Sequence, residues 1–282
     1  MNMMLDFRSI DPLIELALTE DIGIGDITTE STVSPSQSGI GTFFAESEGV
    51  IAGLPIAQRV FEKVDSSLDF RTLVVDGDRV GSMTPIAEIE GTAKSILTGE
   101  RIALNFIQRL SGTATLTAQF VAATAKYKVK IIDTRKTTAG WRAIQKYAVR
   151  VGGGYNHRFG LYDGVLIKDN HIIAAGGIAQ AVERARLTVP HTVKIEIEVE
   201  TLDGVEEALA AGADIILLDN MSVELMRAAV GEIGKAVLTE ASGGITLEHV
   251  EAVAATGVDL ISVGALTHSA MPSDISLDLK MV

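Results

Sequence analysis

The second half of the chain repeats one pattern six times, and this repetition constrains the fold more than any other feature. Between residues 127 and 265, short apolar runs rich in β-branched residues alternate with amphipathic helical stretches, most of which end in Gly. The apolar runs are 128–133, 164–169, 192–200, 213–220, 235–242 and 258–265. Consecutive βα units with short connections predict a parallel sheet, which either stays open or closes into a barrel. We favour the barrel.

The first part of the chain has a different pattern of apolar and turn-forming residues. Residues 38–94 contain short strand candidates separated by Gly and Asp turns, together with one helical stretch, and predict a small α+β module. A helix is expected before this module, with Ser9 or Asp11 as its cap, Pro12 in its first turn and Gly23 at its end.

Residues 95–126 have the pattern of long helical material that is interrupted near Ser111 and Gly112. We place the boundary between two domains at this interruption.

Composition excludes several classes of protein. The 282 residues include 37 acidic and 24 basic side chains, and the net charge of −13 argues against non-specific binding of nucleic acid or anionic membrane. The absence of cysteine excludes disulfides and thiolate metal sites. The N-terminus lacks the features of a signal peptide, and no run approaches ~18 uninterrupted apolar residues. We therefore expect a cytoplasmic protein that does not span a membrane.

Positive charge gathers after the first two apolar runs. The segment "DTRKTT" supplies Arg135 and Lys136, and "GGGYNHRFGLYDGVLIKDNH" adds His157, Arg158 and Lys168. Because the carboxyl ends of parallel strands form one face, these groups should line one mouth. Arginine can bind a carboxylate or a phosphate through two hydrogen bonds, and lysine acts as a point charge. The pattern favours a small ligand with several negative charges over the alternative, a solvated basic loop.

Acidic residues end the next two runs. Glu196, Glu198 and Glu200 alternate along "KIEIEVE" and therefore share one face of a strand, and Asp219 lies within "LLDN". One interpretation is that Glu198 and Asp219 form salt bridges with the cations of the mouth. The other is that they hold Mg²⁺, which is usually bound by one or two carboxylates together with substrate phosphates.

Two glycine-containing turns follow the last two runs. Ser242, Gly243 and Gly244 form one strand-to-helix turn, and Gly264 and Ala265 lie in the other. Backbone N–H groups at such turns bind phosphate, and barrels often place a phosphate site after their last two strands. A purely structural role for both turns is the alternative.

Several motifs, in this order, resemble the quinolinate phosphoribosyltransferase family from residue 20 almost to the C-terminus. They are "GERIALNFIQRLSGTAT", "DTRKTTAGWRAIQKYAVRVGGGYNHRFGLYDGVLIKDNHI", "EIEVE", "LLDNM", "EASGGI" and "ISVGALTHSA". The resemblance implies an N-terminal α/β sandwich domain over residues 1–112 and an incomplete parallel α/β barrel, similar to a TIM barrel, over 113–272. It also implies that residues 273–282 return to the first domain.

The resemblance implies an activity as well. Enzymes of this family transfer a phosphoribosyl group from phosphoribosyl pyrophosphate to quinolinate in the presence of Mg²⁺. The products are nicotinate mononucleotide, pyrophosphate and CO₂, and the reaction belongs to NAD biosynthesis. The minimal active form is expected to be a homodimer in which Arg101 enters the site of the partner subunit, and a higher oligomer is possible.

Matching the motifs residue by residue implies a set of site residues. Quinolinate would lie among Arg101, Arg135, His157, Arg158 and Lys168, and phosphoribosyl pyrophosphate among Thr134, Lys136, Lys168, Ser242, Gly243, Gly244, Gly264, Ala265 and His268. Glu198 and Asp219 would hold Mg²⁺ and the ribose, and their carboxylates would stabilise positive charge on that sugar. Lys168 is the candidate for orienting the departing carboxylate or supplying a proton.

Three other functions remain open at this point. A related phosphoribosyltransferase takes nicotinate and does not decarboxylate, but a monocarboxylate needs fewer cations than this site supplies. A paralogue associated with molybdenum transport departs from the family at the "IKDNH" stretch, which this chain retains. The third alternative is a non-catalytic protein that senses a phosphorylated metabolite.

Overall fold

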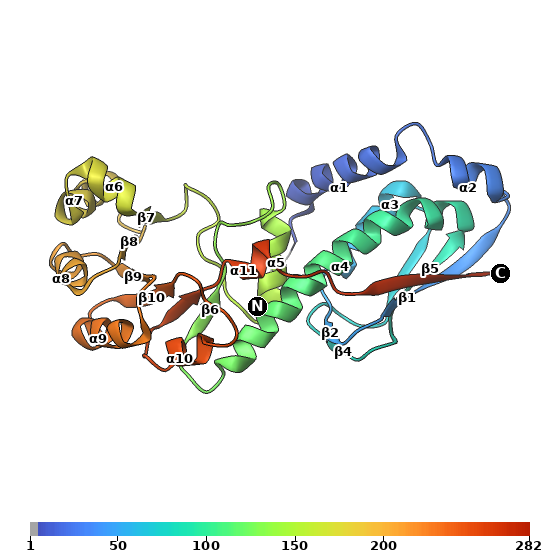
Figure 1. Cartoon of the computed structure of the whole chain (residues 1–282). Helices are drawn as coiled ribbons and strands as arrows, with labels where there is room; N and C mark the ends of the chain where they lie inside the picture. The colour runs from blue at the N-terminus through green and yellow to red at the C-terminus, as the bar shows by residue number, and fades with distance from the viewer. Residues whose placement is uncertain (1–4) are drawn as a thin grey trace. The chain divides into compact units, whose positions relative to one another are not determined.

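The computed structural model describes residues 5–282, and the chain divides into two compact units (Figure 1). The first unit contains the described residues up to Ala118 together with Thr138–Gly153 and Thr267–Val282. The second unit contains Gln119–Thr137 and Gly154–Leu266. The chain thus passes between the units several times, and the exact domain limits expected from the sequence stay a prediction.

The first unit is built on an antiparallel sheet. Its strand order is β12-β1-β5-β3, from β12 (Ile275–Met281), β1 (Ser38–Ala45), β5 (Thr84–Thr92) and β3 (Asp69–Thr72). The remaining elements are α1 (Phe7–Ile22), α2 (Ile27–Thr32), β2 (Gly49–Val50), α3 (Leu54–Val64), β4 (Arg79–Val80), α4 (Ala93–Ala123), which continues past this unit, and α5 (Arg142–Val151). Every second residue of β1 is buried, and Phe43 packs edge-on against Phe61 of α3 with ring centroids 6.0 Å apart. The helices therefore share one apolar core with the sheet.

The first helix begins earlier than the sequence predicts. Asp6 caps α1 because its carboxylate accepts a hydrogen bond from the Arg8 N–H at 3.1 Å. Pro12 consequently lies inside the helix and not in its first turn, so the expected cap at Ser9 or Asp11 is wrong. The expected end at Gly23 is confirmed, because the Gly23 N–H closes the last turn on the Thr19 carbonyl.

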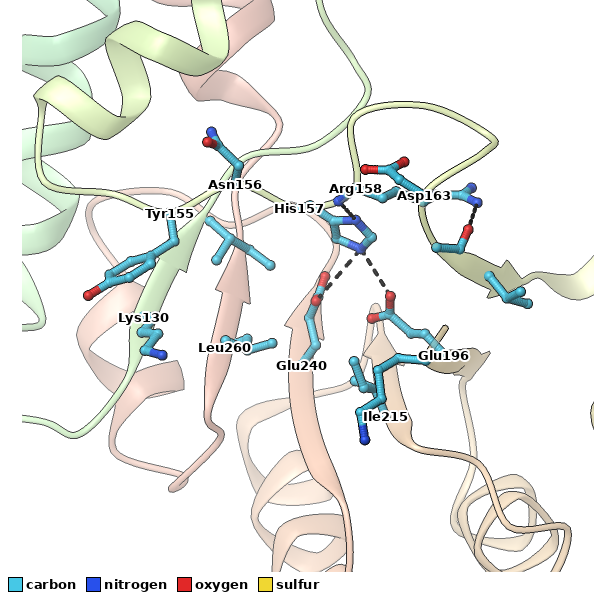
Figure 2. A pocket seen from close by; sticks show the side chains of 14 residues that line it. Lys130, Tyr155, Asn156, His157, Arg158, Asp163, Glu196, Ile215, Glu240 and Leu260 are labelled. Atoms are coloured by element: carbon cyan, nitrogen blue, oxygen red, sulfur yellow. Dashed lines mark hydrogen bonds and ion pairs between the residues drawn. The ribbon is translucent and has the colours of Figure 1, made fainter. Parts of the chain in front are cut away.

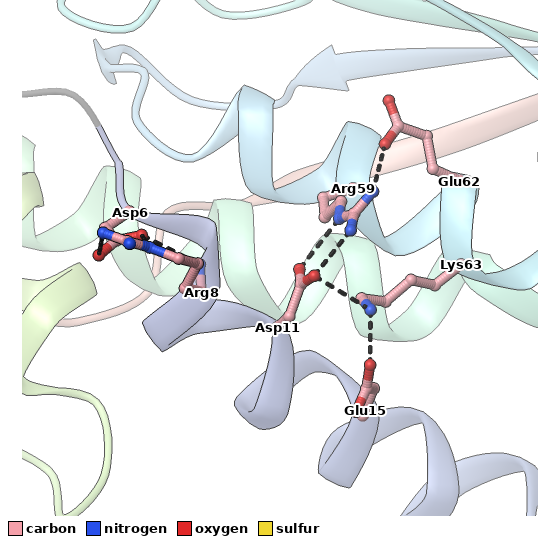
Figure 3. A network of polar contacts seen from close by, with 7 residues as sticks. All are labelled: Asp6, Arg8, Asp11, Glu15, Arg59, Glu62 and Lys63. Atoms are coloured by element: carbon pink, nitrogen blue, oxygen red, sulfur yellow. Dashed lines mark hydrogen bonds and ion pairs between the residues drawn. The ribbon is translucent and has the colours of Figure 1, made fainter.

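Asp11 links two helices and does not cap one. Its carboxylate accepts from the Arg59 guanidinium at 2.7 and 2.9 Å, and Lys63 bridges it to Glu15 on α1 (Figure 3). This network fastens α1 to α3 along the surface of the first unit.

The helix α4 is continuous through Ser111 and Gly112, so the interruption expected there is wrong. Both small residues serve close packing. The Ser111 hydroxyl accepts from the Ala52 N–H at 3.0 Å, and a Cβ on Gly112 would lie 2.0 Å from the Met271 carbonyl oxygen. The small residues Ser111 and Gly112 are needed for close packing, but in the sequence they look like the end of a helix.

The second unit confirms the expected parallel sheet. Its six strands have the order β6-β11-β10-β9-β8-β7, and all pairings are parallel. The strands are β6 (Lys130–Ile132), β7 (Val165–Ile167), β8 (Ile195–Val199), β9 (Ile215–Asp219), β10 (Leu238–Ser242) and β11 (Leu260–Ser262). The helices are α6 (Asp169–Ala175), α7 (Ile178–Thr188), α8 (Leu202–Ala210), α9 (Val223–Ile233) and α10 (Val250–Ala254), and the short turn α11 (Ala265–His268) begins in this unit and ends in the first. Six strands are fewer than a closed eightfold barrel contains, as the resemblance implies.

The edge strand β6 is extended by a segment from further along the chain. Tyr155 forms an isolated parallel bridge with Ile132, and its N–H donates to the Ile131 carbonyl at 2.8 Å. The residues that follow Tyr155 are thereby fixed against the end of β6. No helix within the described residues is long and apolar enough to cross a membrane.

Candidate active site

A cavity of about 470 Å³ lies at the carboxyl ends of the strands of the second unit. The predicted site residues that line it are Thr134, Arg135, Lys136, His157, Arg158, Lys168, Glu198, Asp219, Ser242, Gly243 and Gly244. Most come from the ends of five strands and the turns that follow, whereas His157 and Arg158 lie in the segment between α5 and β7. The structure therefore brings most of the predicted residues together, while the role of each stays a prediction.

Four predicted residues do not line this cavity. Gly264 and Ala265 follow β11 in the sequence but are not part of the lining formed by the described residues. Arg101 lies exposed on α4, and His268 ends α11 with its Nδ1 2.6 Å from the Ser269 hydroxyl. Both belong to the first unit, so their predicted roles rest on the sequence alone.

Five lining residues are not among the predicted site residues, namely Leu166, Leu217, Asn220, Glu240 and Ser262, although Glu240 is a polar residue near the end of its apolar run. A signal for Glu240 was present. Glu240 and Ser242 are two positions apart on one strand, so their side chains point to the same face. Ser242 was recognised, and the alternation could have added Glu240.

Two partly buried arginines, Arg135 and Arg158, form the cationic wall of the cavity. The Arg158 guanidinium donates from Nη1 to the Gly164 carbonyl at 2.9 Å. The Nε atoms of Arg135 and Arg158 are buried and have no hydrogen-bond partner in the protein. Burial and the neighbouring charge of Arg135 lower the pKa of Arg158. A buried donor without an acceptor is costly, and an anionic ligand would satisfy both groups.

The loop after Arg158 is held by Asp163. Its carboxylate accepts from the Phe159 N–H at 2.7 Å and from the Gly160 N–H at 2.9 Å. This turn returns the chain to Gly164 and β7, so the carbonyl that anchors Arg158 has a fixed position.

Carboxylates stand opposite the cations. Lys168, directly after β7, forms an ion pair with Glu198 near the end of β8. Asp219 ends β9, and its carboxylate accepts from the Asn220 side-chain amide at 2.7 Å. The salt bridge confirms one part of the structural interpretation, that Glu198 pairs with a cation of the mouth. It does not remove the second interpretation, because a carboxylate has two oxygens.

The ends of β9 and β10 fit together through Gly243. Asn220 has φ +51°, and its N–H donates to the Ser242 carbonyl at 3.0 Å. A Cβ on Gly243, where φ is +97°, would lie 2.2 Å from Asn220 Oδ1 and 2.8 Å from its backbone nitrogen. Only glycine fits this position.

A second cavity, of about 300 Å³, lies below the first, on the side where the strands begin. Figure 2 shows that Glu196 of β8 and Glu240 of β10 point toward the ring of His157. We call these three residues the floor cluster. The His157 Nε2 atom lies 3.0 Å from a Glu196 oxygen and 3.9 Å from a Glu240 oxygen. Both carboxylates are buried, and each has one oxygen, Oε1, without a hydrogen-bond partner.

Comparisons with known proteins add an independent finding. Residues 26–111 match the family model described as quinolinate phosphoribosyl transferase, N-terminal domain, and residues 113–278 match the model of the C-terminal domain. A probable nicotinate-nucleotide pyrophosphorylase (carboxylating) of Bacillus subtilis is 48% identical over 277 residues, which are 98% of this chain and 96% of that protein. A mitochondrial quinolinate phosphoribosyltransferase (decarboxylating) 2 of Nicotiana glauca is 40% identical, over 95% of this chain and 81% of that protein. The crystal structure of NadC from Streptococcus pyogenes superposes with a TM-score of 0.95, at 42% identity and 99% coverage of both chains.

Proposed function

The chain belongs to the quinolinate phosphoribosyl transferase family and is an enzyme, and on that premise we propose that it converts quinolinate and phosphoribosyl pyrophosphate into nicotinate mononucleotide, pyrophosphate and CO₂. The observation that carries the proposal is the pair of arginines in the cavity whose Nε donors are buried and have no partner in the protein. A dicarboxylate and a polyphosphate are the kinds of ligand that such a cavity favours. The product would place the reaction in NAD biosynthesis.

Quinolinate binds, in this proposal, at the cationic wall. Arg135 and Arg158 each face one ring carboxylate, because their planar guanidinium groups match carboxylate geometry. Lys168 lies across the cavity and can reach the same ligand once Glu198 takes another partner. Arg101 of a second subunit completes the site, so a homodimer is the minimal active form.

Phosphoribosyl pyrophosphate and Mg²⁺ are assigned to the other side of the cavity. Glu198 and Asp219 fit the ion because carboxylate oxygens are the hard ligands that Mg²⁺ takes, and the two side chains end neighbouring strands. When bound there, the ion would offset the negative charge of the pyrophosphate group. Lys136, with the turn that contains Ser242, adds contacts to the phosphates.

The reaction then follows from what the side chains can do. The bond from ribose C1 to pyrophosphate breaks with its electron pair on the leaving oxygen, and the carboxylates of Glu198 and Asp219 stabilise the positive charge on the sugar. The pyridine nitrogen donates its electron pair to C1. The positive ring nitrogen accepts the electron density left when the C2 carboxylate departs as CO₂, and C2 takes up one proton. Lys168 orients that carboxylate or supplies the proton.

The decisive experiment measures release of pyrophosphate and CO₂ from quinolinate, phosphoribosyl pyrophosphate and Mg²⁺ by the purified protein. We expect both products in equal amounts, with the activity lost in Arg135→Ala. Arg227→Ala is the matched control, because Arg227 is an exposed arginine on α9 of the same unit. Turnover of nicotinate without CO₂ would favour the related phosphoribosyltransferase, and binding without turnover would favour a sensor.

The shared site can be tested separately. Arg101→Ala and Arg135→Ala should each be inactive alone. Mixed dimers can carry one intact site if Arg101 acts across the interface, so mixing the two variants after dissociation should restore part of the activity. Failure of mixing to restore any activity in confirmed heterodimers would place Arg101 in its own subunit's site.

A further inference from the structure

The two carboxylates of the floor cluster have no role in the reaction as proposed above, yet they are buried beside His157, which lines both cavities. We propose that Glu196 is a positioning residue, which holds the ring of His157 so that His157 in turn holds the backbone of Arg158 and keeps its guanidinium at the substrate cavity. The inference rests on the proposed function only where it names quinolinate as the ligand of Arg158.

The first step concerns the hydrogen on the imidazole ring. The Arg158 N–H donates to His157 Nδ1 at 2.6 Å, so Nδ1 acts as an acceptor and carries no hydrogen. The ring hydrogen is therefore on Nε2, as assigned from the hydrogen-bond network. Nε2 lies 3.0 Å from the Glu196 carboxylate, which accepts this hydrogen. The Glu240 oxygen, at 3.9 Å, is too far for a hydrogen bond.

The same tautomer argues against a metal ion in the floor cluster. Histidine and two glutamates with ligand atoms within 4.8 Å of one another are a suitable set by residue type. A metal ion on Nε2 would require that atom to lose its hydrogen, and Nδ1 could then satisfy the Arg158 N–H only as an imidazolate. The geometry instead matches a carboxylate that orients a neutral imidazole.

The backbone on the other side of His157 is also fixed. The His157 N–H donates to Asp133 Oδ1 at 2.9 Å, and the Asn156 side chain donates to Asp133 Oδ2 at 2.6 Å. Asp133 is fully buried directly after β6. With Tyr155 bridged to β6, the imidazole ring is the part of this segment that depends on Glu196 for its orientation.

Glu196 also acts on Arg158 through charge. Burial and the neighbouring Arg135 lower the pKa of Arg158, whereas the carboxylate of Glu196 opposes that change. Glu240 contributes differently, because its own burial and the charge of Glu196 raise the pKa of Glu240 well above its usual range. The negative charge of Glu196 therefore favours the charged form of Arg158.

Steady-state kinetics of two Glu196 variants test the proposal. Glu196→Leu removes the acceptor, and we expect the KM for quinolinate to rise about 10-fold or more, as is typical when a partner that orients a ligand-binding residue is lost. The KM for phosphoribosyl pyrophosphate should change less than about 2-fold. Glu196→Gln keeps an oxygen that can accept from Nε2 and should recover most of the loss. Equal rises in both KM values, or no recovery by glutamine, would overturn the inference.

A second readout does not depend on turnover. In protein labelled with ¹⁵N-histidine, the His157 ring should show a protonated Nε2 and an unprotonated Nδ1, and the signal is assigned by its loss in His157→Gln. Glu196→Leu should change this pattern, whereas Glu200→Leu, at an exposed position directly after the same strand, should not. A ring protonated on Nδ1, or a stoichiometric metal ion that Glu196→Leu removes, would also overturn the inference. Absence of turnover in the unmodified protein would instead contradict the proposed function and leave the ¹⁵N result to decide this one.

Discussion

Two glutamates on β8 make the same kind of contact in different surroundings. Glu198 pairs with Lys168, whose side chain is 45% exposed, whereas Glu196 pairs with His157, whose side chain is 12% exposed. The upper pair faces the cavity where ligands arrive, so its partners can exchange. The lower pair is more deeply buried, so it can hold a geometry but cannot readily change partners. On one strand, Glu198 thus faces the ligand cavity, whereas Glu196, two residues earlier, orients a neighbouring side chain.

The largest effect should come from the group that the lower pair supports. Arg158→Leu removes a partly buried cation that can bind a carboxylate through two hydrogen bonds, and kcat/KM for quinolinate should fall about 100-fold or more. Initial-rate kinetics with each substrate varied will measure it. Arg158→Lys retains the charge without the planar guanidinium, and its kcat/KM for quinolinate should lie between those of the unmodified protein and Arg158→Leu. An equal loss of affinity for both substrates would contradict a role limited to quinolinate.

Changes in the upper pair, Glu198 and Lys168, should alter the Mg²⁺ dependence of the rate. Changes in the lower pair, Glu196 and His157, should not. Glu198→Gln removes one carboxylate charge, so we expect at least about 10-fold lower kcat and a higher Mg²⁺ concentration for half-maximal rate. A titration with Mg²⁺ at saturating substrates gives both values. Glu200→Gln is the matched control, since Glu200 is exposed and lies directly after the same strand. An unchanged Mg²⁺ dependence would remove Glu198 from the proposed metal site.

Glu240, which lines the lower cavity, should affect the pH dependence of the free energy of unfolding. Because the folded state raises the pKa of Glu240, it binds a proton that the unfolded chain releases, so Glu240 destabilises the fold increasingly as pH rises above the ordinary carboxyl range and toward the raised value. The charge of Glu196 raises the pKa of Glu240 further, whereas the charge of Lys168 lowers it, and His157 lies 3.9 Å from the Glu240 carboxylate.

Glu240→Gln imitates the neutral acid and should therefore flatten the curve. Thermal unfolding at pH 5 and pH 8 should show little change at the lower value and a Tm higher by roughly 2 °C or more at the upper one. A variant that is less stable than the parent at pH 8 would show that the carboxylate form is the stabilising one.

The smallest effect should come from the loop that anchors Arg158 from outside. Asp163→Asn loses one of two carboxylate acceptors for backbone N–H groups, and the KM for quinolinate should rise only about 3-fold. The same kinetic assay applies. An effect larger than that of Glu196→Leu would mean that the loop, and not the floor cluster, controls the orientation of Arg158.

These contrasts also show what the sequence could predict. That Arg135, Lys168, Glu198 and Asp219 lie together could be predicted, because the carboxyl ends of parallel strands form one face and apolar periodicity locates those ends. The fold class followed from the same periodicity together with the family resemblance.

The support beneath the site was harder to predict. Glu240 lies inside a strand, where its distance to His157 depends on the order of β8, β9 and β10 in the sheet, which no local pattern specifies. The continuity of α4 through Gly112 was missed for a related reason, because the neighbour that requires glycine, Met271, is far away in the sequence. The cap at Asp6 was missed because Pro12 gave a misleading local signal for the helix start.

The close fit of Gly243 against Asn220 has a consequence for ligand binding. Asn220 also donates to Asp219, so the carboxylate proposed for Mg²⁺ and the turn proposed for phosphate are connected through one side chain. The two halves of a phosphorylated sugar would therefore meet a surface that is already assembled, and little ordering would remain to be done on binding. A larger residue at position 243 would displace Asn220 and thereby disturb the Asp219 carboxylate on the neighbouring strand, even without contacting a ligand.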